Sequence, residues 1–303
     1  MLPSKFRPER RPRILISYWY FKSRNVGEIL SRFSQKPDVF ADSGAFSAWS
    51  LGGSVDVDEY GDWLHKWREH FTLYANLDVK GDVDAGLRNQ RRLESRGLSP
   101  IPVWHSGEPW STLEDMVADY PYIALGGLAG GSNANGSDIV KKMLIRCFQI
   151  AQGKSVYHGF GLTNPMIMSM FPWYSVDSTT WNSGVRFATQ IVFNYRTGAY
   201  EKLKYRQRQK AYALRDLLQS YGCDWKYIDK PGKGQRREML MLGAASFAVA
   251  EQWLREQHGL VFHPTTQGKG IRIYMADTNV ENLVLVDEAR GRVAAKNVEA
   301  AHG

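Results

Sequence analysis

Short runs of apolar residues recur along the first two thirds of this 303-residue chain, and a stretch with helical spacing follows most of them. Runs that are apolar throughout, instead of alternating with polar residues, are typical of parallel strands covered on both faces. Strands are predicted at 14–19, 39–42, 73–79, 101–105, 122–127, 156–161 and 174–177, with an eighth within 185–194. Helices are predicted at 60–71, 87–96 and 137–152, the last with Ser137 as its N-cap.

Successive strand ends lie roughly 20–35 residues apart, which is the length of a strand–helix unit. Eight such units predict an α/β fold, a TIM-like (β/α)8 barrel, with residues 1–195 as its catalytic core. A doubly wound open sheet is the alternative, because strand order cannot be read from a sequence. Residues 196–303 are predicted to form a C-terminal extension packed on the barrel. Its expected elements are a basic helix over 201–219, an apolar helix over 237–257 and a β-hairpin pairing 260–263 with 270–275.

The charge balance favours an anionic partner. The net charge is +8 and the isoelectric point is near 9.3, which suits nucleic acid because Lys and Arg displace counterions from phosphates. Cys147 and Cys223 stand too far apart for a disulfide framework or a metal-binding spacing. We therefore expect no metal site and a reducing, cytoplasmic setting. No apolar run is long enough to cross a bilayer, so no membrane association is expected.

Residues with chemical functions gather at the predicted strand ends, where the active sites of such barrels lie. A lone aspartate there is usually a turn or cap residue, but three of them, Asp42, Asp78 and Asp177, together predict a site. A glycine pair, Gly126 and Gly127, would let a ligand approach the bare backbone. The surrounding sequence lacks the spacing of phosphate-binding or dinucleotide-binding loops. The candidate set is Asp42, Asp78, His105, Gly126, Gly127, Leu128, His158, Gly159 and Asp177.

Four sequence blocks, 42–46, 76–79, 123–129 and 175–181, with a weaker fifth at 158–161, resemble the tRNA-guanine transglycosylase superfamily. The likeness covers roughly the first 190 residues, and it is greatest to the phage and bacterial branch that installs 7-deazaguanine bases in DNA. If phage-encoded, such a protein acts in the host cytoplasm. The resemblance implies no cofactor, and a free 7-deazaguanine such as preQ0 as the second substrate.

The resemblance also implies roles for individual residues. Asp177 would attack C1′ of the nucleotide, and Asp42 would act as general acid and base. Asp78 would bind the Watson–Crick-like edge of the base. The backbone of residues 126–128 would contact the substituent at position 7. His105 stands where tRNA-acting members often carry a Gln, and the other expected substrate-binding residues are His158 and Gly159.

The departures from the family point towards DNA. The tRNA-acting members usually hold zinc with three cysteines and a histidine, a set that two cysteines cannot supply. DNA is therefore the expected partner, with tRNA as the alternative, and the target base must be flipped out or single-stranded. Residues expected to contact nucleic acid, unless they are only a solvated face, are Lys202, Lys204, Arg206, Arg208, Lys233, Arg236 and Arg237. Trp19, Phe46, Trp104 and Trp181 lie near the predicted rim, where they would form aromatic walls, although each taken alone is more often a core residue.

Two further functions remain open at this point. A pair of carboxylates with the same chemistry would also suit a glycoside or nucleoside hydrolase, which would release a base without exchange. A non-catalytic nucleic-acid-binding module would use the basic residues alone. Nothing in the sequence indicates an oligomeric state.

Overall fold

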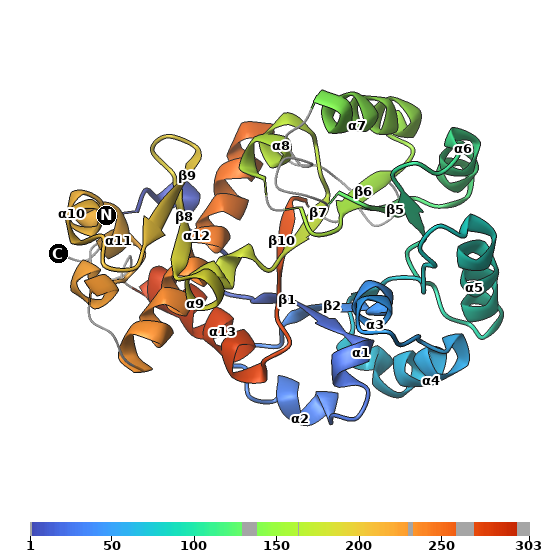
Figure 1. Cartoon of the computed structure of the whole chain (residues 1–303), viewed down its shortest axis with the longest axis horizontal. Helices are drawn as coiled ribbons and strands as arrows, with labels where there is room; N and C mark the ends of the chain where they lie inside the picture. The colour runs from blue at the N-terminus through green and yellow to red at the C-terminus, as the bar shows by residue number, and fades with distance from the viewer. Residues whose placement is uncertain (1, 129–137, 163, 230–232, 259–269, 296–303) are drawn as a thin grey trace.

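The computed structural model describes residues 2–128, 138–162, 164–229, 233–258 and 270–295 (Figure 1). Eight strands form one all-parallel, curled sheet in the spatial order β3-β2-β1-β10-β7-β6-β5-β4. A parallel bridge between Ala75 and Ile101 connects its two edges. The predicted TIM-like α/β fold is confirmed. The strands are β1 (Arg13–Ser17), β2 (Asp38–Asp42), β3 (Leu73–Tyr74), β4 (Val103–His105), β5 (Tyr122–Gly126), β6 (Val156–Gly159), β7 (Ser175–Ser178) and β10 (Arg272–Ala276).

Helices follow the strands along the chain, and Figure 1 shows α4 to α7 in an arc outside the sheet. Asp56 and Asp82 begin α4 and α5, where each side chain accepts hydrogen bonds from backbone N–H groups of the first turn. The predicted helices at 60–71, 87–96 and 137–152 are confirmed, although Ser137 lies outside the described residues. The helices are α1 (Tyr18–Phe21), α2 (Val26–Leu30), α3 (Ala45–Ser50), α4 (Val57–Trp67), α5 (Val83–Ser95), α6 (Trp110–Asp119), α7 (Asp138–Ala151) and α8 (Pro165–Met170), with 3-10 turns η1 (Ser4–Phe6) and η2 (Arg68–His70).

Strand alternation separates the inside of the barrel from the outside. Ile14, Val39 and Ile123 belong to the large core between sheet and helices. Leu15, Phe40 and Ala124, one residue later on each strand, belong to a smaller cluster inside the sheet. Because successive side chains point to opposite faces, the inward set at the carboxyl ends of the strands is Ser17, Asp42, His105, Gly126, His158 and Asp177.

Three sequence-based expectations for residues 185–303 were wrong. The segment expected to hold the eighth barrel strand forms β8 (Thr189–Asn194), which pairs antiparallel with β9 (Ala199–Lys204) in a separate sheet. The eighth barrel strand is β10, which lies between β1 and β7 and is parallel to both. Residues 270–275 therefore form no hairpin; the other predicted arm, 260–263, lies outside the described residues.

The basic helix predicted over 201–219 was also wrong. The segment begins as strand β9 and continues as α10 (Arg208–Ala213) and α11 (Arg215–Ser220). Leu203 is fully buried between exposed Lys202 and Lys204, which is the two-residue period of a strand. The helix predicted over 237–257 is confirmed as α12 (Lys233–His258). The remaining elements are η4 (Thr180–Asn182), α9 (Ser183–Phe187), η5 (Trp225–Asp229) and α13 (Val280–Ala295).

A buried ion-pair cluster fastens α12 to the amino end of the barrel. Glu251 on α12 is fully buried, and its Oε1 lies 2.5 Å from the Arg13 guanidinium at the start of β1. Its Oε2 accepts a hydrogen bond of 2.8 Å from the Ile273 N–H on β10. Arg290 of α13 lies 3.5 Å from the same carboxylate. The cluster joins β1, β10, α12 and α13.

Among the described helices, none is long and apolar enough to span a membrane.

Candidate active site

Three aspartates meet at the carboxyl ends of the strands, as the sequence predicted. Asp42 ends β2, Asp177 lies on β7 and Asp78 follows β3. They lie close enough to interact. Burial raises the pKa of Asp42 to about 7, and the negative charges of Asp78 and Asp177 contribute to the increase. Near neutral pH Asp42 is therefore partly protonated, the condition that a general acid and base requires.

A tight turn holds the Asp42 carboxyl. Its Oδ2 accepts a hydrogen bond of 3.0 Å from the Gly44 N–H. Gly44 has a φ of 75°, and a Cβ there would lie 2.2 Å from the Ser17 Oγ and 2.6 Å from the Trp19 Cβ. Only glycine fits both the left-handed backbone and this close approach. Ser17 pairs in register with Asp42, so its hydroxyl belongs to the site although the sequence blocks gave no reason to include it.

The Asp177 carboxylate is held at one oxygen. Its Oδ1 accepts a hydrogen bond of 2.7 Å from the Gly161 N–H and lies 3.3 Å from the His158 Nε2. Among the described residues, no donor reaches its Oδ2. The side chain keeps 10% of its surface exposed. One oxygen is thus fixed by the protein, and the other remains available to a substrate.

His158 does not line the mouth of the barrel, in contrast to its predicted role in substrate binding. The side chain is fully buried, with the rings of Phe40 and Phe160 at centroid distances of 4.6 and 4.7 Å. Its Nδ1 lies 2.5 Å from the Ser175 Oγ. Ser175, His158 and Asp177 resemble a hydrolase triad, but Ser175 is fully buried, so its hydroxyl cannot attack a substrate.

Asp78 forms an ion pair with His105, whose Nε2 lies 2.7 Å from the Asp78 Oδ2. Burial acts to lower the pKa of His105. The hydrogen bond and charge of Asp78, with the charge of Glu108, outweigh burial and raise that pKa above its usual value. Glu108 accepts a hydrogen bond of 3.0 Å from the His105 N–H, and burial raises its own pKa. The sequence blocks did not single out Glu108; its only signal is its position three residues after the strand-end histidine.

The predicted glycines have different environments. A Cβ on Gly126 would lie 2.5 Å from the His105 Nδ1, so this glycine leaves room for the histidine ring. Gly127 is exposed and has a φ of 74°. Leu128 buries its side chain in the outer core, which leaves only its backbone for a ligand. Gly159 faces Trp173 and Leu162 outside the sheet, so its predicted role in substrate binding was wrong.

A small cavity lies below the Asp78–His105 pair. Its volume is about 10 Å³, room for one water molecule. Asn76 and Gln90, both buried, line it together with Glu108. A nucleobase is too large for this cavity.

The predicted basic residues do not form one helix face. Lys202 and Lys204 are exposed on β9, Arg206 lies in the next turn and Arg208 begins α10. Arg236 is exposed on α12. Arg237 instead forms ion pairs with Glu288 and Glu238, and the side chain of Lys233 lies outside the described ones.

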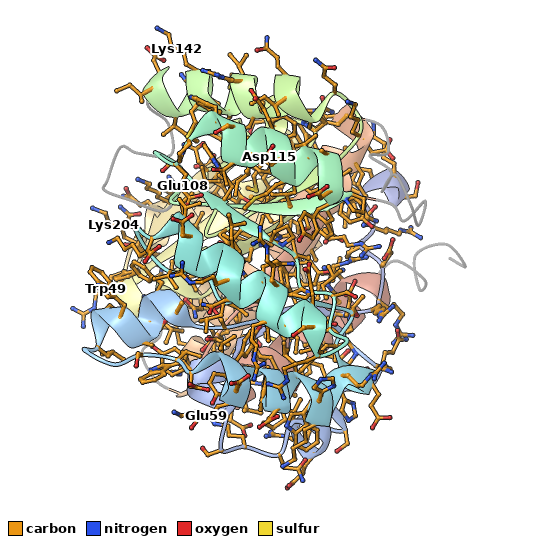
Figure 2. All side chains as sticks on the ribbon, turned by 90° about the vertical axis from the view of Figure 1, so that its right-hand side faces the viewer. Trp49, Glu59, Glu108, Asp115, Lys142 and Lys204 are labelled. Carbon is orange, nitrogen blue, oxygen red and sulfur yellow. The ribbon has the colours of Figure 1, made fainter. Side chains whose placement is uncertain are left out.

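Exposed aromatic side chains lie next to the aspartates. Phe46 and Trp49 on α3, directly after the Asp42 turn, keep 67% and 58% of their surface exposed. The Lys80 Nζ lies 3.8 Å from the centroid of the Trp49 ring. Figure 2 shows Trp49 and Lys204 on the same side of the molecule, although Figure 1 places β9, which carries Lys204, well apart from α3. We call Phe46, Trp49 and Lys80 the rim surface.

The other predicted aromatic walls behave differently. Trp104 and Trp181 are 1% and 0% exposed, so both are core residues. Their indole N–H groups donate to the backbone oxygens of Pro109 and Ala276. Trp19 is half-buried beside the Asp42 turn, where the Lys22 Nζ lies 4.8 Å from its ring.

Comparison with protein-family profiles, curated proteins and solved structures found no match to this chain. Among the described residues, no group of three His, Cys, Asp or Glu side chains is arranged to hold a metal ion. Cys147 and Cys223 are both buried and are not joined in a disulfide.

Proposed function

We propose that this protein is a base-exchange transglycosylase, which replaces guanine in DNA with a free 7-deazaguanine through a covalent intermediate on Asp177. The observation that supports this most directly is the pairing of two carboxylates with different roles. Asp42 has a pKa of about 7, whereas Asp177 has one oxygen fixed and one available. A carboxyl with a pKa near neutrality can exchange a proton with the base, and a carboxylate with one oxygen left unbonded by the protein can act as the nucleophile.

In the first step, Asp177 Oδ2 attacks C1′ of the nucleotide. The bond between C1′ and the base nitrogen breaks, its electron pair goes to the base, and protonated Asp42 supplies the proton. In the second step, the nitrogen of the incoming base loses its proton to Asp42 and attacks C1′. The ester bond breaks and returns its electron pair to Asp177. Two displacements at one carbon retain its configuration, and no cofactor is consumed.

The Asp78–His105 pair supports recognition of a guanine-like base. Guanine and 7-deazaguanine present ring N–H and amino donors on one edge, and the Asp78 carboxylate is an acceptor. His105 holds that carboxylate from the side at 2.7 Å. Gly126 lies beside the His105 ring and Gly127 beside Ser106, and we propose that their backbone contacts a substituent on the base. Both the departing and the arriving base would use this arrangement.

The rim surface supports a nucleic-acid partner. Aromatic rings exposed beside cations suit stacked bases and phosphates, and the target base must leave its helix to reach Asp177. We propose that Phe46 and Trp49 stack against bases next to the target, while Lys80 contacts phosphates. DNA is proposed over tRNA because the chain cannot form the cysteine-rich zinc site of the tRNA-acting branch.

The test supplies isotope-labelled preQ0 with either DNA or tRNA, digests the product to nucleosides and measures them by mass spectrometry. Labelled deazaguanosine in DNA is expected, with one guanine released for each label incorporated. Asp177→Asn should abolish both, and Asp115→Asn on the exposed face of α6 is the control that keeps both.

The other outcomes identify the alternatives. Label found in tRNA but not in DNA would show that the nucleic-acid substrate is tRNA. Base released without incorporation would indicate a hydrolase. Nucleic-acid binding without either reaction, unchanged in Asp177→Asn, would leave a binding module and refute the enzyme assignment.

A further inference from the structure

A buried chain of hydrogen bonds leads away from Asp177 into the barrel. The His158 Nε2 lies 3.3 Å from Asp177 Oδ1, and the His158 Nδ1 lies 2.5 Å from the Ser175 Oγ. Ser175 in turn bonds to the Tyr122 hydroxyl. His158 and Ser175 have no exposed surface, and Tyr122 has 6%. The chain joins inward side chains of β5, β6 and β7.

The direction of each hydrogen bond follows from what each group can donate. An ionised carboxylate only accepts, so the His158 Nε2 must carry the proton that points to Asp177. In a neutral imidazole the Nδ1 then accepts, so the Ser175 hydroxyl donates to it. The Ser175 oxygen is left to accept from Tyr122. The sequence of donors therefore runs from Tyr122 to Ser175, to His158 and to Asp177.

The surroundings of His158 favour the neutral ring. Burial lowers its pKa, against the opposing effect of Asp177. The polar and titratable groups that face it are Asp177 and Ser175 on β7 and, at a ring distance of 6.4 Å, Tyr274 on β10. The rings of Phe40 and Phe160 cover its sides.

We propose that His158 is a positioning residue for Asp177, held in its Nε2–H tautomer by Ser175 and Tyr122. Together with the Gly161 N–H it fixes Oδ1 of the carboxylate, so that Oδ2 is the oxygen presented to the substrate. A fixed nucleophile loses less freedom on reaching the transition state, and a displacement of about 1 Å costs about a hundredfold in rate. The catalytic part of this inference rests on the proposed transglycosylase activity, whereas the tautomer does not.

The tautomer is tested on the isolated protein by ¹⁵N NMR of histidine-labelled samples. His158 should show a protonated Nε2 and an unprotonated Nδ1 at neutral pH. Ser175→Ala should change the Nδ1 signal and increase the fraction of the other tautomer. Ser155→Ala removes a buried hydroxyl that bonds only to backbone oxygens, and it should leave the spectrum unchanged. A protonated Nδ1 in the wild type would overturn the proposal, whether or not the protein is an enzyme.

The positioning role is tested by exchange kinetics. His158→Phe keeps a planar ring without a donor and should lower kcat by about a hundredfold, with less effect on KM for the free base. His158→Gln places an N–H near the position of the Nε2 and should recover about tenfold of that loss. If His158→Phe does not fold, Ser175→Ala replaces it, with a smaller expected loss in kcat. If His158→Phe has the same kcat as the wild type, the positioning proposal is overturned. If the wild type shows no exchange, the proposed function is refuted instead, and the tautomer is then decided by the NMR measurement alone.

Discussion

Replacing Asp42 with Asn should stabilise the folded chain, and the gain should increase with pH. In the folded state the pKa of Asp42 is about 7, against an ordinary value of 3.8. Between these values the folded state binds more protons than the unfolded state, so wild-type stability falls as pH rises through this window. Asn does not titrate, so the variant lacks this loss.

The magnitude follows from the two pKa values. One pKa unit corresponds to about 1.4 kcal/mol, so ionising Asp42 costs the folded state at most about 4 kcal/mol. Most of the cost develops after pH 5. The difference in unfolding free energy between Asp42→Asn and the wild type should therefore increase by about 2 to 3 kcal/mol from pH 5 to pH 8.

The assay is urea unfolding of both proteins at several pH values, with the denaturant slopes compared to check that the unfolded states match. Asp115→Asn, an exposed carboxyl on α6, is the matched control and should follow the wild-type profile. In an Asp177→Asn background the pH-dependent gain should shrink but persist, because burial is the larger cause and the charge of Asp177 the smaller. A difference that stays constant between pH 5 and pH 8 would refute the reasoning and remove the main support for Asp42 as acid and base.

Three further outcomes are expected. Gly44→Ala should lower the free energy of unfolding by about 1–3 kcal/mol and reduce exchange, because the new Cβ would clash with Ser17 and Trp19. Gly52 has the same φ of 75° but no atom within 4 Å of a Cβ, so Gly52→Ala reports backbone strain alone. Thermal unfolding of both variants therefore separates the clash from the strain. Glu251→Ala should lower the free energy of unfolding in urea by about 3–5 kcal/mol, since it leaves Arg13 and Arg290 buried without this partner. A loss below about 1 kcal/mol would show that the ion-pair cluster does not stabilise the fold. Trp49→Ala should weaken single-stranded DNA binding by about 1–3 kcal/mol in a fluorescence titration. Leu51 is also exposed (66%, against 58% for Trp49) but cannot stack, so Leu51→Ala should leave binding unchanged, and equal losses in the two variants would reject stacking.

The strand-end aspartates show how far the sequence reached. Asp42, Asp78 and Asp177 were each found from a short apolar run that ends in a carboxylate, and parallel strands then require that their ends meet at one face. The same reasoning placed His158 and Gly159 at the site, but burial by Phe40 and Phe160 and packing against Trp173 exclude both from the mouth. Whether a strand-end side chain reaches solvent depends on its inward or outward parity and on the layers above it, which no local pattern records.

By itself, the sequence determined the α/β class, the positions of seven strands along the chain and three of the helices between them, because apolar periodicity and turn residues act over a few positions. Only the tertiary structure decided which segment completes the barrel. The runs at 189–194 and 272–276 both suit a strand, and the second takes the place between β1 and β7 because its inward Tyr274 hydrogen-bonds to Asp38 while Glu251 binds the Ile273 N–H. These contacts join residues 236 positions apart in one case and 22 in the other, so no local sequence pattern records them.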